Sequence, residues 1–431
     1  MQLLPLNFLI FTVSGIWRSV EWLSRCTKLL YNTFTFYTIA PLYFWVFSQF
    51  INLVLIIDNM EEFIVSFFIF LSYFAVSCKA AIAIIRRGAI IDLVETLSRA
   101  PCKPRDADEV AIQTKFDELI RSGTKQYALL AMGSVSTFNI QSVLNIMDCI
   151  LPCQTWTLYD LNSYYLFLIT GIQEIVLTMC FSTVINVGMA TLIFGMVLQT
   201  CAQLEIFEKR VHKLIINRTT KLVGKKSSPD TSTIHKEEMI SGYICHHFII
   251  YKYAKTLNNA FNQVLFVQFF VNTYILCTVV YYLASHIMDS HSIFLMLYTI
   301  CMFIQIYIYC WAGNKVILKS ASLGNAVYQI NWYMLSNSEK KNLLMIMKRS
   351  TIPIKFISSF LIILSLDAFI GVSIIMICEL SNSNSIYERS LTLYFFYRFS
   401  KHILRSICCN RKLETVENNV KMYLIIIMIT L

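Results

Sequence analysis

Long apolar runs separated by short polar segments make up most of the chain. A helix needs about 20 apolar residues to cross the hydrocarbon core of a bilayer. Seven runs come close to or exceed that length, and we predict a transmembrane helix at each: about residues 32–57, 62–85, 127–150, 164–199, 258–285, 292–313 and 353–378. The fourth and fifth runs are longer than a bilayer requires, so we expect one end of each to leave the membrane as a helix.

The composition agrees with a membrane protein. Hydrophobic residues make up 56% of the chain and charged residues only 14%, against about 25% charged residues in soluble domains. The 14 cysteines are scattered and include no CxxC pair, so a disulfide scaffold or a zinc ribbon is not expected. The apolar N-terminus lacks a basic start and an A-x-A cleavage site, and we do not interpret it as a signal peptide.

Basic residues are confined to one side of the predicted helices. The N-terminal segment and the loops after helices two, four and six carry 27 Lys and Arg residues, and the three opposite loops carry none. Because Lys and Arg favour the cytoplasmic side, we predict a cytoplasmic N-terminus. Membrane orientation thus explains the net charge of +10, and no nucleic-acid partner is expected. The predicted fold class is an all-α membrane protein with seven transmembrane helices.

Motifs for catalysis or nucleotide binding do not occur in the sequence, including GxGxxG, GxxxxGK[ST], HExxH and GxSxG. We therefore predict no enzyme activity, no cofactor and no metal site. Adjacent His246 and His247 point in different directions on a helix, which disfavours a shared metal. Cys149 and Cys153 share an outer loop and are a candidate disulfide, while Asn217 is a glycosylation acceptor on the cytosolic side and is not expected to be used.

Two acidic residues, Glu174 and Asp367, lie inside apolar runs. Ionisable residues within the membrane are costly, and they point to functional sites by default. We interpret Glu174 as lying near the outer end of a long tilted helix. Asp367 lies in the middle of the seventh run, where it either contributes to a pore or helix contact or is a satisfied packing acid.

Aromatic residues are dense in the outer halves of several predicted helices. Small organic ligands are usually held in largely apolar cavities with a few polar groups. Packing within the core or against lipid explains any single aromatic residue as well, so only the set as a whole suggests a ligand site. The candidate ligand contacts are Phe70, Tyr73, Phe74, Phe138, Gln141, Phe167, Tyr281 and Tyr298.

Several stretches resemble insect odorant receptors, particularly those of Hymenoptera. They include LNFLIFTVSGIW near the N-terminus, IIRRGAIIDLVETL after the second run, ILPCQTWTLYDLNS before the fourth and TCAQLEIFEKRVHKLI after it. The most specific matches follow the pattern Q-x4-C-W-x-G-N from Gln305 to Asn314, then Ser322, Tyr328, Trp332, and KKNLLMIMKRSTIP ending at Pro353. The resemblance covers residues 1–372 and agrees with the orientation that the charges predict.

The resemblance implies a subunit of a tetrameric, ligand-gated, non-selective cation channel that assembles with an obligate odorant co-receptor. A small apolar odorant would bind among the second to sixth helices. The seventh helix would line the pore, with Asp367 and Phe369 as candidate pore or gating residues. Cytoplasmic helices would anchor the subunits to one another, through Tyr328, Trp332, Leu343, Leu344 and Met347. The implied location is the plasma membrane of sensory-neuron dendrites, as a multi-pass protein.

The chain departs from the family pattern at two places. Lys315 follows Gly313-Asn314 where the family usually has an acid. After Val372 the family's short pore segment is replaced, and residues 379–431 form an atypical tail with seven basic residues on the predicted outer side. We interpret the tail as translated intron or an aberrant exon. The alternative is a real extension that makes the protein a non-conducting variant.

Three other function classes compete with an odorant-gated channel. A G-protein-coupled receptor needs an outside N-terminus, which the charge distribution opposes, and no DRY or NPxxY motif occurs. A gustatory receptor shares the predicted topology, but its TY-x5-QF motif is missing from the seventh run. A transporter is disfavoured because no pair of matched, broken repeats is present.

Overall fold

The computed structural model describes residues 4–18, 24–55, 60–149, 151, 156, 163–224, 232–285, 292–329, 337–358 and 362–381. Nearly all of the predicted tail, Cys153 and Trp332 lie outside these residues, as do the outer-loop residues 286–291. The described part is helical apart from its connections and one short hairpin. Its elements are α1 (Pro5–Val13), α2 (Arg25–Leu55), α3 (Met60–Ile85), α4 (Arg87–Ser98), α5 (Ala107–Met147), α6 (Tyr164–Gln173), the π-helix η1 (Glu174–Cys180), α7 (Phe181–Gly224), α8 (Ser232–Ser285), α9 (Ser292–Tyr328), α10 (Asn337–Ser350), β1 (Ile357–Ser358), β2 (Ile362–Ile363) and α11 (Leu366–Ser381).

In the described residues the first six predicted transmembrane runs are helical, the fourth being divided among α6, η1 and α7. Within the described residues, four helical stretches are long and apolar enough to cross a membrane by length and composition: Arg25–Val54, Ser66–Ile85, Tyr164–Lys213 and Ile293–Tyr328. The fourth and fifth runs do continue as helices beyond the predicted spans. α7 has 44 residues and α8 has 54, which at 1.5 Å per residue give ~65 Å and ~80 Å, roughly two to three times the thickness of the hydrocarbon core.

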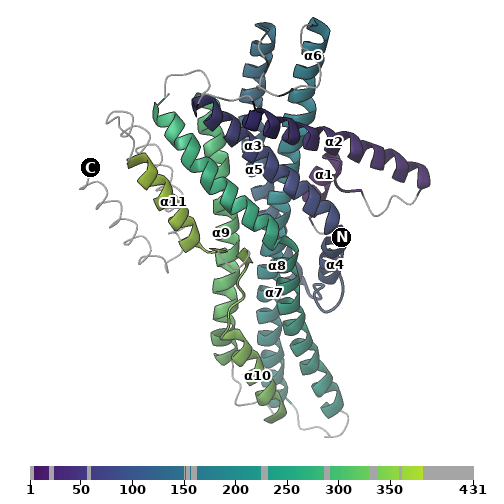
Figure 1. Ribbon diagram of the computed structural model, residues 1–431. Coiled ribbons are helices and arrows are strands. Elements are labelled where there is room, and N and C mark those ends of the chain that lie inside the picture. Colours follow the sequence, from purple (N-terminus) through teal and green to yellow (C-terminus); the bar gives the residue numbers. More distant parts are fainter. Residues whose placement is uncertain are drawn as a thin grey trace.

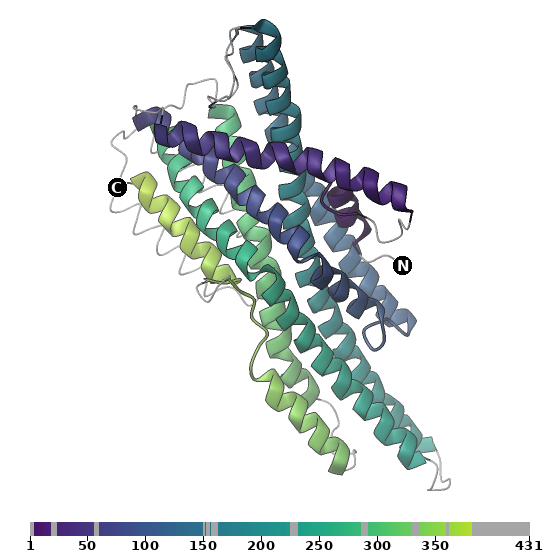
Figure 2. The same ribbon diagram turned by 45° about the vertical axis from the view of Figure 1, so that its right-hand side comes forward.

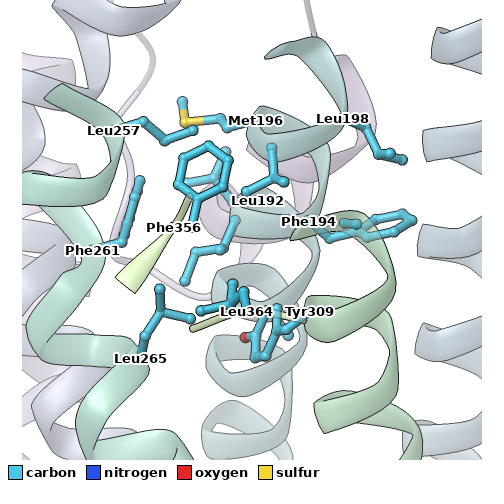
Figure 3. Close-up of a cluster of buried hydrophobic side chains, with 14 of the residues drawn as sticks. Leu192, Phe194, Met196, Leu198, Leu257, Phe261, Leu265, Tyr309, Phe356 and Leu364 are labelled. Carbon is cyan, nitrogen blue, oxygen red and sulfur yellow. The ribbon is translucent and has the colours of Figure 1, made fainter. Parts of the chain in front are cut away.

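The core of the bundle is built around α7. This helix contacts α1, α3, α5, α8 and α9, and its apolar residues occur on every side, as expected for a fully surrounded helix. Figure 3 shows Leu192 and Met196 of α7 facing Leu257 and Phe261 of α8, with Phe356 inserted between the helices. The helices α7, α8 and α9 run side by side through the lower half of the molecule, where α10 packs against α8 and α9 (Figures 1 and 2).

The seventh predicted run, residues 353–378, is only partly helical. Residues 353–356 are extended, Ile357 and Ser358 pair antiparallel with Ile363 and Ile362, and α11 begins at Leu366. Pro353 cannot continue a helix with normal hydrogen bonding, and the β-branched residues that follow favour extended backbone. The prediction of a continuous helix over residues 353–365 was therefore wrong.

The hairpin segment reaches the bundle through a close contact with α9. A methyl group placed on Gly313 would overlap the carbonyl oxygen of Leu364 and would lie 2.6 Å from its Cβ atom. Only a residue without a side chain permits that approach. This contact gives a physical reason for the glycine in the sequence CWAGN.

Candidate functional site

A cavity of about 120 Å³ lies within the upper half of the bundle, and we call it the membrane cavity. Five elements line it: α3, α5, α7 with the preceding η1, α8 and α9. An apolar cavity of ~150 Å³ accommodates a benzene-sized molecule. The membrane cavity is therefore of the right size for a small organic ligand.

Helical spacing brings the lining residues onto one face of each helix. On α3, Phe68, Ser72, Val76 and Lys79 follow at three- and four-residue steps, and α9 contributes Phe294, Tyr298 and Met302 at four-residue steps. Residues three and four apart lie on the same side of an α-helix. The sequence therefore directs these side chains to the same space once each helix is rotated correctly.

Aromatic rings form one part of the cavity wall. Phe68 packs edge-on against Tyr298 with ring centroids 5.6 Å apart, and Phe138 lies 4.4 Å from Phe294. Ser72 donates a hydrogen bond to the carbonyl oxygen of Phe68 at 2.8 Å, so the 2.8 Å contact between Ser72 and Tyr298 uses the phenol as donor. These contacts hold the rings in fixed positions beside the empty volume.

Polar side chains form the other part of the wall. The amine of Lys79 donates to Oδ1 of Asn186, which also accepts from Nε2 of Gln305 at 3.2 Å. Oε1 of Gln305 in turn accepts from Nε2 of Gln268 at 2.9 Å and from Nδ2 of Asn272 at 3.3 Å. This network joins α3, α7, α8 and α9, and four of its five members line the cavity.

The helix beside the cavity is irregular. Residues Glu174–Cys180 form the π-helix η1, and Met179 of that segment lines the cavity together with Ser182 and Thr183 of the following turn. π-Helical turns inside α-helices occur frequently at functional sites. Glu174 is buried at the first position of η1.

The predicted ligand contacts separate into two groups. Tyr73, Phe138 and Tyr298 line the cavity, whereas Phe70, Phe74, Gln141 and Phe167 are not among its lining residues. Phe70 stacks on Phe74, which is 40% exposed on the outer surface of α3, and Gln141 donates to Asn145 at 3.0 Å. The side chain of Tyr281 lies outside the described part.

Sequence reasoning missed the polar residues of the cavity. Lys79, Asn186, Gln268 and Asn272 were absent from the candidate set, which was chosen for aromatic character. One signal was present, because Lys79 is an ionisable residue well inside an apolar run and such residues favour a functional site. The amides carry no comparable signal in the sequence alone.

The family is decided by comparison with known proteins. A model of the 7tm odorant receptor family matches residues 59–374. The chain belongs to the odorant receptor family. The predicted resemblance is thereby confirmed.

Named relatives and solved structures agree with this assignment. Odorant receptor 46a, isoform A, of Drosophila melanogaster is 24% identical over 275 residues, covering 61% of this chain and 67% of that protein. Odorant receptor 45a of the same species is 24% identical over 137 residues, 32% of this chain and 36% of that protein. In odorant receptor 45a and other relatives from this species, the match covers about a third of the relative's length.

The fold matches a solved receptor. The insect olfactory receptor OR5 from Machilis hrabei superposes with a TM-score of 0.75 at 13% identity, covering 86% of this chain and 94% of that one. Its complex with eugenol gives the same TM-score at 12% identity, covering 86% and 95%. The prediction of an all-α membrane protein with seven transmembrane helices is confirmed.

The candidate pore residues of the receptor lie in the first turn of α11. Phe369 is buried and packs edge-on against Phe303 and Tyr307 of α9, with centroid distances of 4.8 and 5.5 Å. Asp367 is exposed, and its charge at the N-terminus of α11 is favourable for the helix dipole. Their roles in conduction stay predictions.

The described candidate anchor residues lie on α10 and at the end of α9. Leu343 is buried against the bundle and Met347 partly so, while Leu344 and Tyr328 are 63% and 61% exposed. The role of these residues as contacts between subunits stays a prediction.

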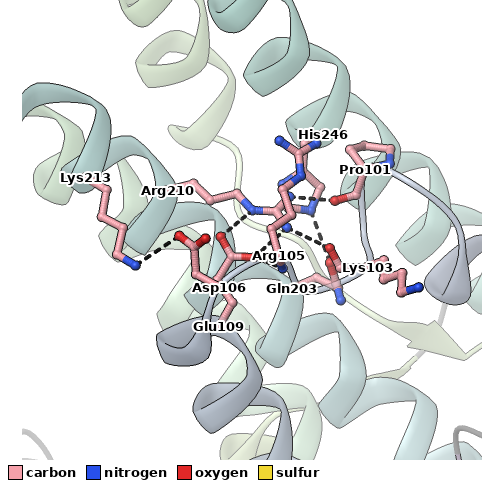
Figure 4. Close-up of polar contacts among 9 residues, drawn as sticks. All are labelled: Pro101, Lys103, Arg105, Asp106, Glu109, Gln203, Arg210, Lys213 and His246. Atoms are coloured by element: carbon pink, nitrogen blue, oxygen red, sulfur yellow. Dashed lines mark hydrogen bonds and ion pairs between the residues drawn. The ribbon is translucent and has the colours of Figure 1, made fainter. Parts of the chain in front are cut away.

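A second buried polar site lies near the basic end of the bundle, which the charge rule places in the cytoplasm. Nε and one terminal nitrogen of Arg210 donate to the two carboxylate oxygens of Glu109 at 2.9 and 2.7 Å. The remaining N–H groups reach the carbonyls of Pro101 and Lys103 at 2.5 and 2.9 Å and Nδ1 of His246 at 3.1 Å (Figure 4). We call these residues, with Gln203, the Arg210 cluster.

Histidine chemistry in this cluster follows from its partners. A guanidinium cannot accept a hydrogen bond, so Nδ1 of His246 is the acceptor, and Nε2 carries the proton donated to Gln203 at 3.1 Å. Burial lowers the pKa of His246 to about 3, and the nearby charge of Arg210 acts in the same direction. His246 is thus a neutral structural residue.

Proposed function

We propose that the protein is an odorant receptor subunit that binds a small, largely apolar ligand in the membrane cavity and gates a non-selective cation channel together with the odorant co-receptor. Membership of the family and the aromatic cavity between five helix segments support this proposal. The cavity is the observation that carries it, because its size and mixed lining fit a small organic molecule.

In this proposal, ligand binding changes the balance between closed and open channels. A ligand can shift that balance only by its difference in affinity for the two states. Phe369 of α11 packs on Phe303 and Tyr307, and α9 also carries Tyr298 and Met302 of the cavity wall. One helix therefore connects the ligand site to the proposed pore helix over one to two turns.

We further propose the plasma membrane of sensory-neuron dendrites as the site of action, and a heterotetramer as the assembly. Tyr328, Leu343, Leu344 and Met347, with Trp332, are the proposed subunit contacts. Asp367 and Phe369 are the proposed pore or gating residues.

Expression with and without the co-receptor tests the channel proposal. We expect odorant-evoked cation current only when both subunits are present, and reduced or lost responses when Val135→Phe fills the cavity. Val143→Phe on the exposed surface of α5 is the matched control and should respond normally. Current from the receptor without the co-receptor, or responses unaffected by Val135→Phe, would contradict the proposal.

A non-conducting variant is the second candidate. The family match ends at residue 374, close to Val372, where the sequence departs from the family's ending. Sequencing the transcript across codon 372 tests this directly. A spliced message that encodes the usual pore segment supports the conducting receptor, and a message with the present reading frame supports the variant.

A further inference from the structure

Lys79 is a buried lysine whose amine lies at the wall of the membrane cavity. Its side chain is on the lining face of α3, the residue is 2% exposed, and its amine bonds to Asn186, which also lines the cavity. An ammonium group has three N–H donors. Only one of them has an acceptor among the described residues.

The hydroxyl groups around the cavity do not provide comparable free donors. Ser182 and Thr183 both donate to the carbonyl oxygen of Met179, at 3.0 and 2.8 Å. Ser72 donates to Phe68, and Tyr298 donates to Ser72. The unused donors on the described wall are therefore concentrated at Lys79 and at the amide nitrogens of Asn186 and Asn272.

The described part of the wall provides no counter-ion for Lys79. The twenty described residues that line the cavity include no Asp or Glu. Burying a charge without a partner is expensive, and charged hydrogen bonds to a carboxylate are among the strongest available to an ammonium group. A ligand that brought a carboxylate into the cavity would supply both the missing charge and the missing acceptors.

We propose that the receptor's ligand is a small organic carboxylate. Its oxygens bind Lys79 and the amide of Asn186, and its hydrocarbon body lies against Phe68, Phe138, Phe294 and Tyr298. This inference rests on the proposed function, because it names the ligand class of the same cavity. The cavity has a volume of about 120 Å³, so the proposed carboxylate is a small one.

Paired probes on the full-length receptor in lipid nanodiscs test the proposal by calorimetric binding. The acids are benzoate, phenylacetate and hexanoate, and each is compared with the alcohol of the same skeleton: benzyl alcohol, 2-phenylethanol and hexan-1-ol. We expect at least one acid to bind ~10-fold or more tightly than its alcohol. Lys79→Met should abolish that ratio, and Lys79→Arg should retain part of it.

Two further variants keep the test decisive. Lys79→Gln keeps a donor to Asn186 but removes the charge, so this variant should also lose the acid preference. It takes the place of Lys79→Met in the test if the methionine variant does not fold. Val76→Ala changes the same face of α3 one turn away and should alter the affinities for acid and alcohol in parallel, leaving their ratio intact.

The outcomes separate this proposal from the proposed function. If alcohols bind as well as acids, or if Lys79→Met keeps the preference, the carboxylate proposal is overturned while odorant binding stands. If no probe of either class binds the wild-type receptor, both proposals are overturned.

Discussion

The membrane cavity and the Arg210 cluster are both buried and polar, but they differ in how completely their hydrogen bonds are used. All five N–H groups of Arg210 have acceptors, and Glu109 receives a further bond from the backbone of Arg105 at 2.8 Å. At the cavity, Lys79 keeps donors without a described acceptor, and Oε1 of Gln268 is buried without a partner.

That difference separates a structural site from a binding site. A fully satisfied network holds one arrangement of the backbone and leaves nothing for a ligand to bind. A partly satisfied network is costly by itself, and a ligand with matching groups lowers that cost. A buried basic side chain is therefore predicted to stabilise the fold at Arg210, where its hydrogen bonds are complete, and to bind a ligand at Lys79, where they are not.

The largest expected effect is the loss of Arg210. Arg210→Met leaves the buried carboxylate of Glu109 without its partner, and breaking a buried ion pair in this way costs ~3–5 kcal/mol. Thermal unfolding of the purified receptor in detergent measures the loss. An Arg210→Met protein as stable as the wild type would remove the structural role of the cluster.

Lys79→Met should behave in the opposite way in the same unfolding measurement. The variant removes an incompletely paired charge, and Asn186 keeps its bond from Gln305. Removing a buried amine whose donors are only partly paired removes a desolvation cost, so the free energy of unfolding should be unchanged or higher. Destabilisation comparable with that of Arg210→Met would show that both sites serve stability alone.

Lowering the pH should weaken the Arg210 cluster. Burial lowers the pKa of His246 to about 3 and that of His247 to about 4. The unfolded chain binds these protons near pH 6.5 and the folded chain does not, so stability is complete above about pH 6.5 and falls as the pH decreases towards 4. Each histidine contributes at most ~1.4 kcal/mol per pH unit in that window. Unfolding temperatures from pH 7.5 to 4.5 check the slope, which His246→Gln should reduce.

A smaller effect is expected at the hydroxyl of Tyr298. Tyr298→Phe removes its bond to Ser72 but leaves the hydroxyl of Ser72 paired with Phe68. The stability change should be ~0.5–1.5 kcal/mol, and ligand affinity should change more than stability if the ring position matters to binding. Unfolding and calorimetric binding on one preparation give both numbers, and an unchanged affinity would weaken the assignment of the cavity wall.

The smallest effect is expected at the edge of the Arg210 cluster. Lys213 pairs with Asp106 and Asp108 at 3.1 and 3.0 Å, and both carboxylates are more than half exposed. Exposed ion pairs contribute ~0.2–1 kcal/mol, so Lys213→Ala should barely alter thermal unfolding. A loss of stability as large as that of Arg210→Met would show that the charge of an ion pair, and not its burial, determines how much the pair stabilises the fold here.

Much of the fold could be predicted from the chain, because apolar length and loop charge are local properties. The seven runs, the long helical extensions of α7 and α8, and the all-α class follow directly from them. Tyr73, Phe138 and Tyr298 were found from a second local property, the density of aromatic residues in the apolar runs. Phe70 and Phe74 could not be separated from them, because the rotation of α3 about its axis depends on which neighbours cover it.

What only the tertiary structure decided is where backbone and polar groups find partners. The amide of Ile354 bonds to Ser320 at 3.0 Å and that of Ile357 to Asn258 at 2.7 Å, so side chains of α9 and α8 stabilise an extended segment where the apolar pattern predicted helix. In the sequence Lys79 is only an ionisable residue inside an apolar run, and it is the packing of α3 with α7, α8 and α9 that places it on the cavity wall. Hydropathy is a property of each residue, whereas hydrogen-bond satisfaction is a property of the assembled fold.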